Sequence, residues 1–281
     1  MEKKILVTGA TGTIGKALIK ALTEQKANFI AATRDVNKLP QEVKGIAFDF
    51  EDASSFAKAT AGVDRVFLLA PPLNTLADQL LYPFIDHLHK ENIKRVVYVS
   101  ALEMDALPKM PFHSNVIKRL QSSGFDLTVL QPSFFAQNFK NYEFENITKH
   151  NIIYAVAGEG KVGFVDAEDI GRVAATALTA DGHSGKFYEI TGPELLSYSD
   201  AAKVISEVIG KTIVYPNPTA EQFSQTLAQA GAPPFIADYM IDVYSLIANN
   251  RVNRITSVVE NVTGRKPTSF KEVIKRDFLK Q

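Results

Sequence analysis

The stretch KILVTGATGTIG, residues 4–15, decides the fold. Its Ile5, Leu6 and Val7 form a short apolar run bounded by polar residues, which is typical of a buried parallel strand. Glycines follow at three-residue intervals, and an apolar pattern with helical spacing begins at Ile14. Strand, glycine turn and helix in this order predict the first half of a nucleotide-binding βαβ unit.

Each glycine of this turn has its own expected role. One lets the chain leave the strand sharply, another removes a Cβ that would keep a pyrophosphate from the backbone N–H groups, and the last lets the helix pack close to the sheet. The spacing is G-x-x-G-x-x-G rather than the usual G-x-G-x-x-G, and such turns also occur without a ligand. The position between strand and helix favours nucleotide binding, with the anion at the helix N-terminus. The predicted cofactor-binding residues of the turn are Gly9, Thr11, Gly12, Thr13, Ile14 and Gly15.

The residues after the second predicted strand indicate which dinucleotide is bound. Residues 28–33 (NFIAAT) predict that strand, and Arg34 follows directly. NAD-preferring sites carry an acidic residue about 20 residues after the glycines, where it binds the ribose 2′-hydroxyl. A guanidinium there can instead bind a 2′-phosphate and stack on adenine, and Lys38 adds a second cation. We therefore expect NADP rather than NAD, although Asp35 leaves room for NAD and Arg34 could be an ordinary surface charge.

Strands and helices continue to alternate through the first half of the chain. Strands are predicted at 44–49, 64–69, 94–100 and 126–130, and helices at 54–61, 76–91 and about 113–122. Ligands bind beyond the carboxyl ends of such strands, so the residues there are further candidates for cofactor binding. Asp49 could bond the adenine amino group, with Phe50 at the ring edge, or could cap the next helix. The other candidates of this kind are Leu69, Ala70, Pro71, Pro132, Ser133 and Phe134.

The second half of the chain is less regular. It predicts strands at 151–156 and 186–191, helices at 166–178 and 196–209, and a mostly helical segment at 219–281 that Pro233 and Pro234 divide. We predict an α/β fold, with a Rossmann-type doubly wound parallel sheet and a small, mostly helical C-terminal lobe. Residues 1–150 would form the NAD(P)-binding domain, and residues 151–281 would complete the sheet and form the substrate lobe.

The composition narrows the class of protein. The 281 residues carry 31 basic and 31 acidic side chains, so no surplus of positive charge indicates nucleic acid. The absence of cysteine excludes disulfides, thiolate metal sites and cysteine nucleophiles, and His87 and His89 are two residues apart on one helix, a spacing unsuited to a metal. No apolar run approaches the ~20 residues of a membrane span, and the one after the first charged residues is too short for a signal peptide. We expect a cytoplasmic monomer or homodimer that acts on a small electrophilic molecule, with no metal, membrane or nucleic-acid partner.

Several stretches together carry a resemblance to a known family. They are TGATGTIG, Arg34, YVSALE, HSNVIKRLQSSG, LTVLQPSFFAQNF, FVDAEDIGRVAATAL, YEITGPELLSY and VTGRKPTSF, and they extend over nearly the whole chain. In these features the sequence resembles the NmrA-like branch of atypical short-chain dehydrogenases/reductases. That family includes NADPH-dependent quinone and triphenylmethane-dye reductases, as well as proteins that bind NADP only as sensors.

The resemblance also implies roles for three residues. Ordinary members of the superfamily use a Tyr four residues before a Lys as general acid, and no Tyr of this sequence has Lys at that offset. His113 with Lys118 five residues later is similar to the His-and-Lys helix of the quinone-reductase type. By this resemblance Lys118 would bond the nicotinamide ribose, His113 could donate a proton or a hydrogen bond to the reduced acceptor, and Ser100 would bond the carboxamide or the substrate. As structural alternatives, Lys118 could be an exposed helix residue, His113 a helix-start residue, and Ser100 the end of a strand.

The missing Tyr restricts the predicted substrate. Reduction of a carbonyl leaves a basic oxygen that needs a matched acid, whereas a quinone, an iminium or a cationic dye accepts hydride without that need. Aromatic and thioether side chains suit a flat conjugated acceptor, although they could equally be ordinary core. The predicted substrate-binding residues are Met104, Met110, Phe112, Phe135, Asn138 and Phe164. The sequence thus predicts an NADPH-dependent oxidoreductase, with a non-catalytic NADP(H)-binding redox sensor as the alternative.

Overall fold

The computed structural model describes residues 4–103, 107 and 111–279, which form two compact units. Each unit is assembled from separate segments of the chain. Unit 1 consists of Met1–Pro132, Ala167–Glu189 and Val258–Arg265. Unit 2 consists of Ser133–Asp166, Ile190–Ser257 and Lys266–Gln281.

A seven-stranded sheet forms the centre of unit 1, in the order β3-β2-β1-β4-β5-β6-β7. Its strands are β1 (Ile5–Val7), β2 (Phe29–Thr33), β3 (Gly45–Ala47), β4 (Arg65–Leu69), β5 (Arg95–Val99), β6 (Asp126–Pro132) and β7 (Phe187–Ile190). The pairs from β3 through β6 are parallel, and Leu6 of β1 lies between Ile30 of β2 and Val66 of β4. Strand order reverses direction at β1, as in doubly wound sheets, so the carboxyl ends of these strands share one edge. The predicted Rossmann-type sheet is therefore confirmed.

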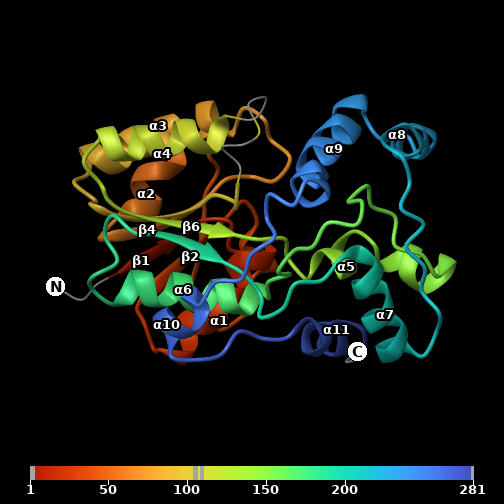
Figure 1. Ribbon diagram of the computed structural model, residues 1–281. Coiled ribbons are helices and arrows are strands. Elements are labelled where there is room, and N and C mark those ends of the chain that lie inside the picture. Colours follow the sequence, from red (N-terminus) through yellow and green to blue (C-terminus); the bar gives the residue numbers. More distant parts are fainter. Residues whose placement is uncertain (1–3, 104–106, 108–110, 280–281) are drawn as a thin grey trace. The chain divides into compact units, whose positions relative to one another are not determined.

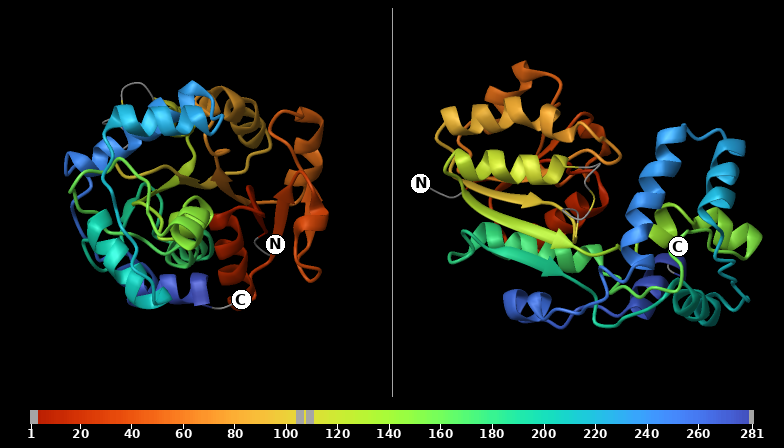
Figure 2. Two further views of the ribbon diagram at one scale, coloured as in Figure 1. Left: turned by 90° about the vertical axis from the view of Figure 1, so that its right-hand side faces the viewer. Right: turned by 45° about the horizontal axis from the view of Figure 1, so that its top comes forward.

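Helices cover both faces of this sheet. One face is covered by α2 (Phe56–Thr60), α3 (Ala77–Lys90) and α4 (Phe112–Ser122). The other face is covered by α1 (Thr13–Glu24), α6 (Ala167–Thr179) and α10 (Val258–Thr263). Figure 1 shows the two layers, and the right-hand view of Figure 2 shows the strands between the orange and yellow helices and the green helix α6. This three-layer arrangement is the usual way to bury both faces of a parallel sheet.

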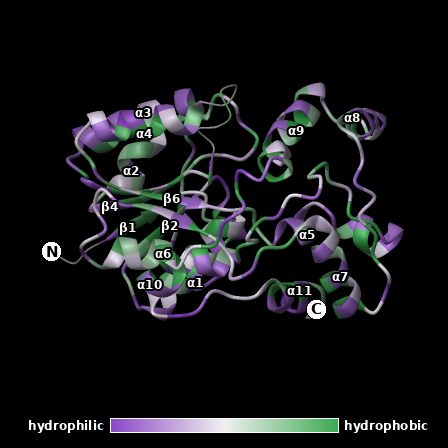
Figure 3. Cartoon of the chain, in the orientation of Figure 1, coloured by the Kyte–Doolittle hydropathy of each residue, from purple (hydrophilic) through white to green (hydrophobic). Residues whose placement is uncertain are grey.

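The core of unit 1 follows from the apolar strands predicted by the sequence. Leu6, Val66, Leu68 and Val96 are fully buried, and they pack with apolar residues of α3 and α4. Helix α3 alternates hydrophobic and hydrophilic residues along its length, as Figure 3 shows, because only one of its faces meets the sheet. Burial of a parallel sheet on both faces explains why its strands read as continuous apolar runs.

Unit 2 is mostly helical. Its helices are α5 (Asn138–Asn141), a π-helical turn (Asn146–His150), α7 (Tyr198–Ile209), α8 (Ala220–Gln229), α9 (Pro234–Ala248) and α11 (Phe270–Leu279). Helix α7 begins with a capping box between Ser197 and Asp200, and ends at Gly210 with a φ of 71°. A capping box and a glycine in the left-handed region are usual helix start and stop signals, and the helix predicted at 196–209 is confirmed. Within the described part of the chain, none of the helices has both the length and the apolar character needed to cross a bilayer.

The predicted strand at 151–156 is wrong. The segment forms only an isolated bridge, between Ile152 and Val214. Two backbone hydrogen bonds flank this bridge, from Ile153 N to Val214 O and from Val214 N to Asn151 O. The partner segment continues into Pro216 and Pro218, which have no N–H group to extend the pairing.

Candidate functional site

The glycine turn lies at the carboxyl end of β1 and is shaped by close backbone contacts. Gly9 has a φ of 63°, and Gly12 N donates a hydrogen bond to Gly9 O over 3.0 Å. A Cβ on Gly15 would lie 2.1 Å from Gly9 O, so only glycine allows α1 to start here. A Cβ on Gly12 would meet only Gly9 O, at 3.3 Å, and Gly12 is exposed. The outer side of the turn is thus open, and no side chain caps the helix at Gly12.

Three side chains that follow β2 have different surroundings. Asp35 accepts a hydrogen bond from Asn37 N over 3.0 Å and thereby caps a short 3₁₀ turn, Val36–Lys38. Arg34 and Lys38 are exposed, and neither side chain makes an ion pair or hydrogen bond with any residue that the structure describes. The Asp35 carboxylate is engaged by the backbone, while both predicted cations are unpaired.

Other predicted residues follow the ends of β3 to β6, at the same edge of the sheet. Asp52 caps the 3₁₀ turn Ala53–Ser55 before α2, and the Asp49 carboxylate accepts a hydrogen bond from Glu51 N over 3.1 Å. Phe50 packs edge-to-face against Phe48 and Phe84, with ring centroids 4.9 and 5.6 Å apart, so the core of unit 1 holds this ring. At the end of β4 are Leu69, Ala70 and Pro71, and β6 ends at Pro132.

Ser100 follows β5 at that edge and is 6% exposed. Its backbone N–H donates to Leu130 O over 2.8 Å. Its hydroxyl makes no hydrogen bond to any of the described residues. A nearly buried hydroxyl without a protein partner is uncommon, and at this edge of the sheet it is suited to a ligand.

Helix α4 carries the predicted His113 and Lys118. The His113 ring is half-buried, and its Nδ1 lies 2.7 Å from the hydroxyl oxygen of Tyr98, a fully buried residue of β5. Five residues correspond to a rotation of about 140° around a helix, so the two side chains leave α4 in different directions. Lys118 is exposed and has no bonding partner among the described residues. Tyr98 was missed from the sequence, although a Tyr within the aliphatic strand RVVYV is a signal, because its hydroxyl must find a partner in the core.

Unit 2 carries the remaining predicted residues. Ser133 is 4% exposed, and its hydroxyl has no hydrogen-bond partner in the part of the chain that the structure describes. Phe134 stacks on Tyr244 with ring centroids 6.2 Å apart, and Phe135 and Asn138 are half-buried. Two predicted substrate residues, Met104 and Met110, lie outside the described residues.

Two further predicted substrate residues, Phe112 and Phe164, are buried. Phe112 is 5% exposed and packs against the His113 ring, with centroids 4.3 Å apart. Phe164 is 2% exposed and packs within 5.5 Å of the rings of Phe139, Tyr198 and Phe270. The Phe164 ring belongs to the aromatic core of unit 2 and offers almost no surface to a ligand.

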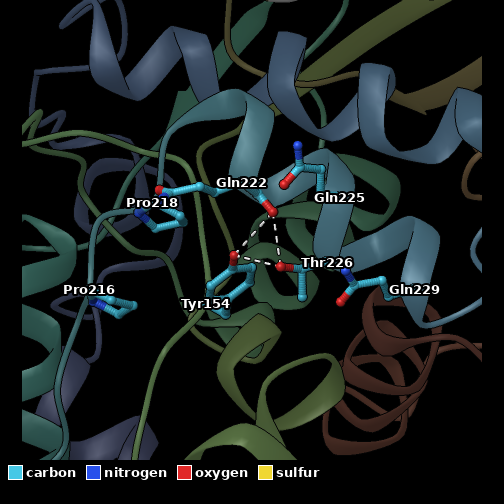
Figure 4. Close-up of a pocket in the computed structure, with 7 residues that line it drawn as sticks. All are labelled: Tyr154, Pro216, Pro218, Gln222, Gln225, Thr226 and Gln229. Carbon is cyan, nitrogen blue, oxygen red and sulfur yellow. Dashed lines mark hydrogen bonds between the residues drawn. The ribbon is translucent and has the colours of Figure 1, made fainter.

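Unit 2 also contains a cavity of about 360 Å³ beside α8 (Figure 4). The Tyr154 hydroxyl points toward α8, where it bonds Thr226 Oγ1 over 2.8 Å and donates to Gln222 O over 3.3 Å. The cavity is lined by Tyr154, Pro216, Pro218, Gln222, Gln225, Thr226 and Gln229. None of the predicted site residues lines this cavity. Over the described residues, no three His, Asp or Glu side chains are grouped as metal ligands would be.

Comparison with known proteins places the chain in a family. The model of the NmrA-like family matches residues 1–275. The chain belongs to the NmrA-like family. The resemblance inferred from the sequence motifs is therefore confirmed.

The proteins that this chain is similar to have different names. The chain is 33% identical to the NAD(P)H azoreductase of Xenophilus azovorans over 280 residues, which is 96% of both chains. It is 30% identical to prestalk A differentiation protein A of Dictyostelium discoideum, over 99% of this chain and 93% of that protein. Among solved structures, the triphenylmethane reductase of Citrobacter sp. in complex with NADP(H) is 25% identical, with a TM-score of 0.86 over 98% of this chain and all of that one.

Proposed function

We propose that this protein is an NADPH-dependent oxidoreductase that delivers hydride to a planar conjugated acceptor such as a quinone or a dye. The observation that carries the proposal is the unpaired, exposed Arg34 at the end of β2, beside a glycine turn with an open outer side. This combination fits a dinucleotide with a 2′-phosphate. The relation to an NAD(P)H azoreductase over nearly the full length of both chains supports the proposed reaction class.

The residues of unit 1 fit the cofactor in several places. The turn at Gly12 has no side-chain cap among the described residues, and the N-terminus of α1, where the helix dipole favours negative charge, is suited to the pyrophosphate. Arg34 and Lys38 supply two cations, whose side chains have no partner among the described residues, for the 2′-phosphate, and the Asp35 carboxylate is engaged in its own cap. The unbonded hydroxyl of Ser100 would accept or donate a hydrogen bond at the nicotinamide end. When bound, NADPH supplies the hydride.

The acceptor class is supported by what the chain lacks. In the sequence no Tyr precedes a Lys by four residues, so the usual acid for carbonyl reduction is absent. The related azoreductase and triphenylmethane reductase are both named for extended conjugated acceptors. An acceptor of this kind spreads the charge that hydride transfer brings, and needs less help from an acid.

The cofactor part of the proposal is tested by titrating the purified protein with NADPH and with NADH. Loss of charge-assisted hydrogen bonds of about 1.5–3 kcal/mol in Arg34→Ala should weaken NADPH binding by about ten- to a hundredfold and leave NADH binding unchanged. Lys94→Ala is the matched control, because Lys94 is an exposed cation that precedes β5 at the opposite edge of the sheet. Equal binding of NADPH by both variants would contradict the assigned 2′-phosphate contact.

A redox sensor that binds NADP(H) without turnover is the second candidate. Two observations favour it: the absence of the usual acid, and the relation to a protein named for differentiation rather than for a reaction. A sensor would bind NADPH tightly and oxidise none with any quinone, azo or triarylmethane acceptor. Turnover above background with any of them would exclude the sensor as the sole function.

A further inference from the structure

The cavity beside α8 has walls that are held in place by contacts within unit 2. The Tyr154 ring stacks on Phe223, with ring centroids 5.8 Å apart, and its hydroxyl is bonded to α8 (Figure 4). On another wall, the Tyr215 hydroxyl donates to Asn217 Oδ1 over 3.0 Å and accepts from Ala157 N over 3.1 Å. Asn217 lies between the two prolines that line the cavity. Walls fixed in this way need little reorganisation when a ligand binds.

Helix α8 presents three exposed glutamines to the cavity, Gln222, Gln225 and Gln229. Spacings of three and four residues place them on one face of the helix. The Gln222 amide uses only its Oε1, which accepts from Thr219 N over 2.9 Å, and Gln225 uses only its Nε2, which donates to Glu221 Oε1 over 3.2 Å. The Gln229 amide makes no hydrogen bond to any residue that the structure describes. Donors and acceptors on this face are therefore left for a ligand.

The chemistry of the lining selects an uncharged ligand. Among the described residues that line the cavity, none carries a charge. A charged ligand would lose water there without gaining an opposite charge. A side-chain amide offers the same N–H and C=O groups as a peptide bond, so the glutamines match a peptide backbone. The tyrosine ring and the two prolines add apolar surface, against which uncharged side chains can pack.

The spacing of the glutamines favours an extended peptide. Gln225 and Gln229 are about one helical turn apart, which is about 6 Å along the helix axis. An extended chain turns its N–H and C=O groups to the same side at every second residue, about 6.6 Å apart. The face from Gln222 to Gln229 is about 10.5 Å long, which corresponds to about three extended residues.

We propose that this cavity is a docking site for an extended, uncharged peptide segment of another protein, whose backbone hydrogen-bonds the glutamines of α8. A peptide C=O would accept from Gln222 Nε2, and a peptide N–H would donate to Gln225 Oε1. The Gln229 amide can pair with both groups of a further peptide unit. The site lies within unit 2, and none of the residues assigned to the cofactor or the acceptor lines it. The inference therefore goes beyond the proposed reductase.

The experiment selects peptides from a phage-displayed library of random heptapeptides on the wild-type protein, and titrates the enriched peptides by calorimetry. We expect uncharged sequences that bind the double variant Gln225→Ala/Gln229→Ala at least about tenfold more weakly, because two hydrogen bonds are lost. This variant should fold, because both positions are exposed and alanine favours helix. N-methylation of single peptide bonds should weaken binding at alternate positions. No enrichment, charged sequences, or equal binding by the double variant would overturn the proposal.

The matched control is Gln121→Ala, which removes an exposed glutamine of α4 in unit 1 and should bind the peptides as the wild-type protein does. Maltose and cellobiose are titrated in parallel. Binding of either sugar that the double variant loses, with no peptide enriched, would replace the peptide by a carbohydrate. NADPH affinity should be the same in all three proteins. Loss of NADPH binding in the double variant would overturn a separate peptide site, whereas peptide binding without any NADPH binding would leave the site standing while the proposed reductase fails.

Discussion

Two single-methyl substitutions in the glycine turn separate its structural role from its binding role. In Gly15→Ala the new Cβ would lie 2.1 Å from Gly9 O and 2.8 Å from Ala10 Cα, both backbone atoms. Ordinary contact begins at 3.4 Å, so the backbone must shift by more than an ångström. Strained insertions of this kind lower the free energy of unfolding by about 1–3 kcal/mol, and we expect the upper end because backbone cannot rotate away.

Gly12→Ala should behave differently. Its Cβ would lie 3.3 Å from Gly9 O, and Gly12 has a φ of −80°, which any residue adopts. We expect the free energy of unfolding to change by less than about 1 kcal/mol, and NADPH affinity to fall at least about tenfold, because the methyl group would occupy the open side of the turn. Urea denaturation and NADPH titration on both variants are the assays. Unchanged NADPH affinity in Gly12→Ala would refute the placement of the pyrophosphate at this turn.

Two further predictions concern unit 2. Arg276 makes two 2.9 Å hydrogen bonds to the fully buried Asp166, so Arg276→Ala should lower the free energy of unfolding by about 3–5 kcal/mol in urea. Lys271→Ala, which removes an exposed ion pair with Glu207, should change the free energy of unfolding by less than about 1 kcal/mol. Equal losses of this free energy in Arg276→Ala and Lys271→Ala would contradict the greater weight given to the buried ion pair. Burial raises the pKa of Glu143 above its usual 4.5, so the folded state retains a proton that the unfolded state loses, and stability falls as pH rises above 4.5. In urea titrations at several pH values, Glu143→Gln should abolish that part of the pH dependence. An unchanged slope of the free energy of unfolding against pH would exclude Glu143 as its source.

Local patterns were sufficient to predict the sheet and most helices. The apolar run Ile5–Val7, the glycines after it and the capping residues of α7 all act within one element, so the sequence alone reveals them. The residues at the strand ends could be named as candidates for the same reason, because a parallel sheet places all carboxyl ends at one edge.

Features that depend on distant segments could not be predicted. The strand expected at 151–156 failed because its partner contains Pro216 and Pro218, far away in the sequence. The bond between Tyr98 and His113 joins a strand to a helix, and nothing in either segment names the other. From the sequence alone, an aromatic residue such as Phe164 can either line a pocket or pack in a core. Only its burial in the folded protein shows that it belongs to the core.

The most direct test of the central claim is single-turnover oxidation of protein-bound NADPH by a quinone and by a ketone of similar size. We expect the quinone to oxidise NADPH in the wild-type protein and the ketone to leave it unoxidised. We also expect His113→Gln to slow the reaction with the quinone while leaving NADPH bound. Tight binding of NADPH with no oxidation by the quinone, or by azo and triarylmethane dyes, would contradict the reductase and favour the sensor.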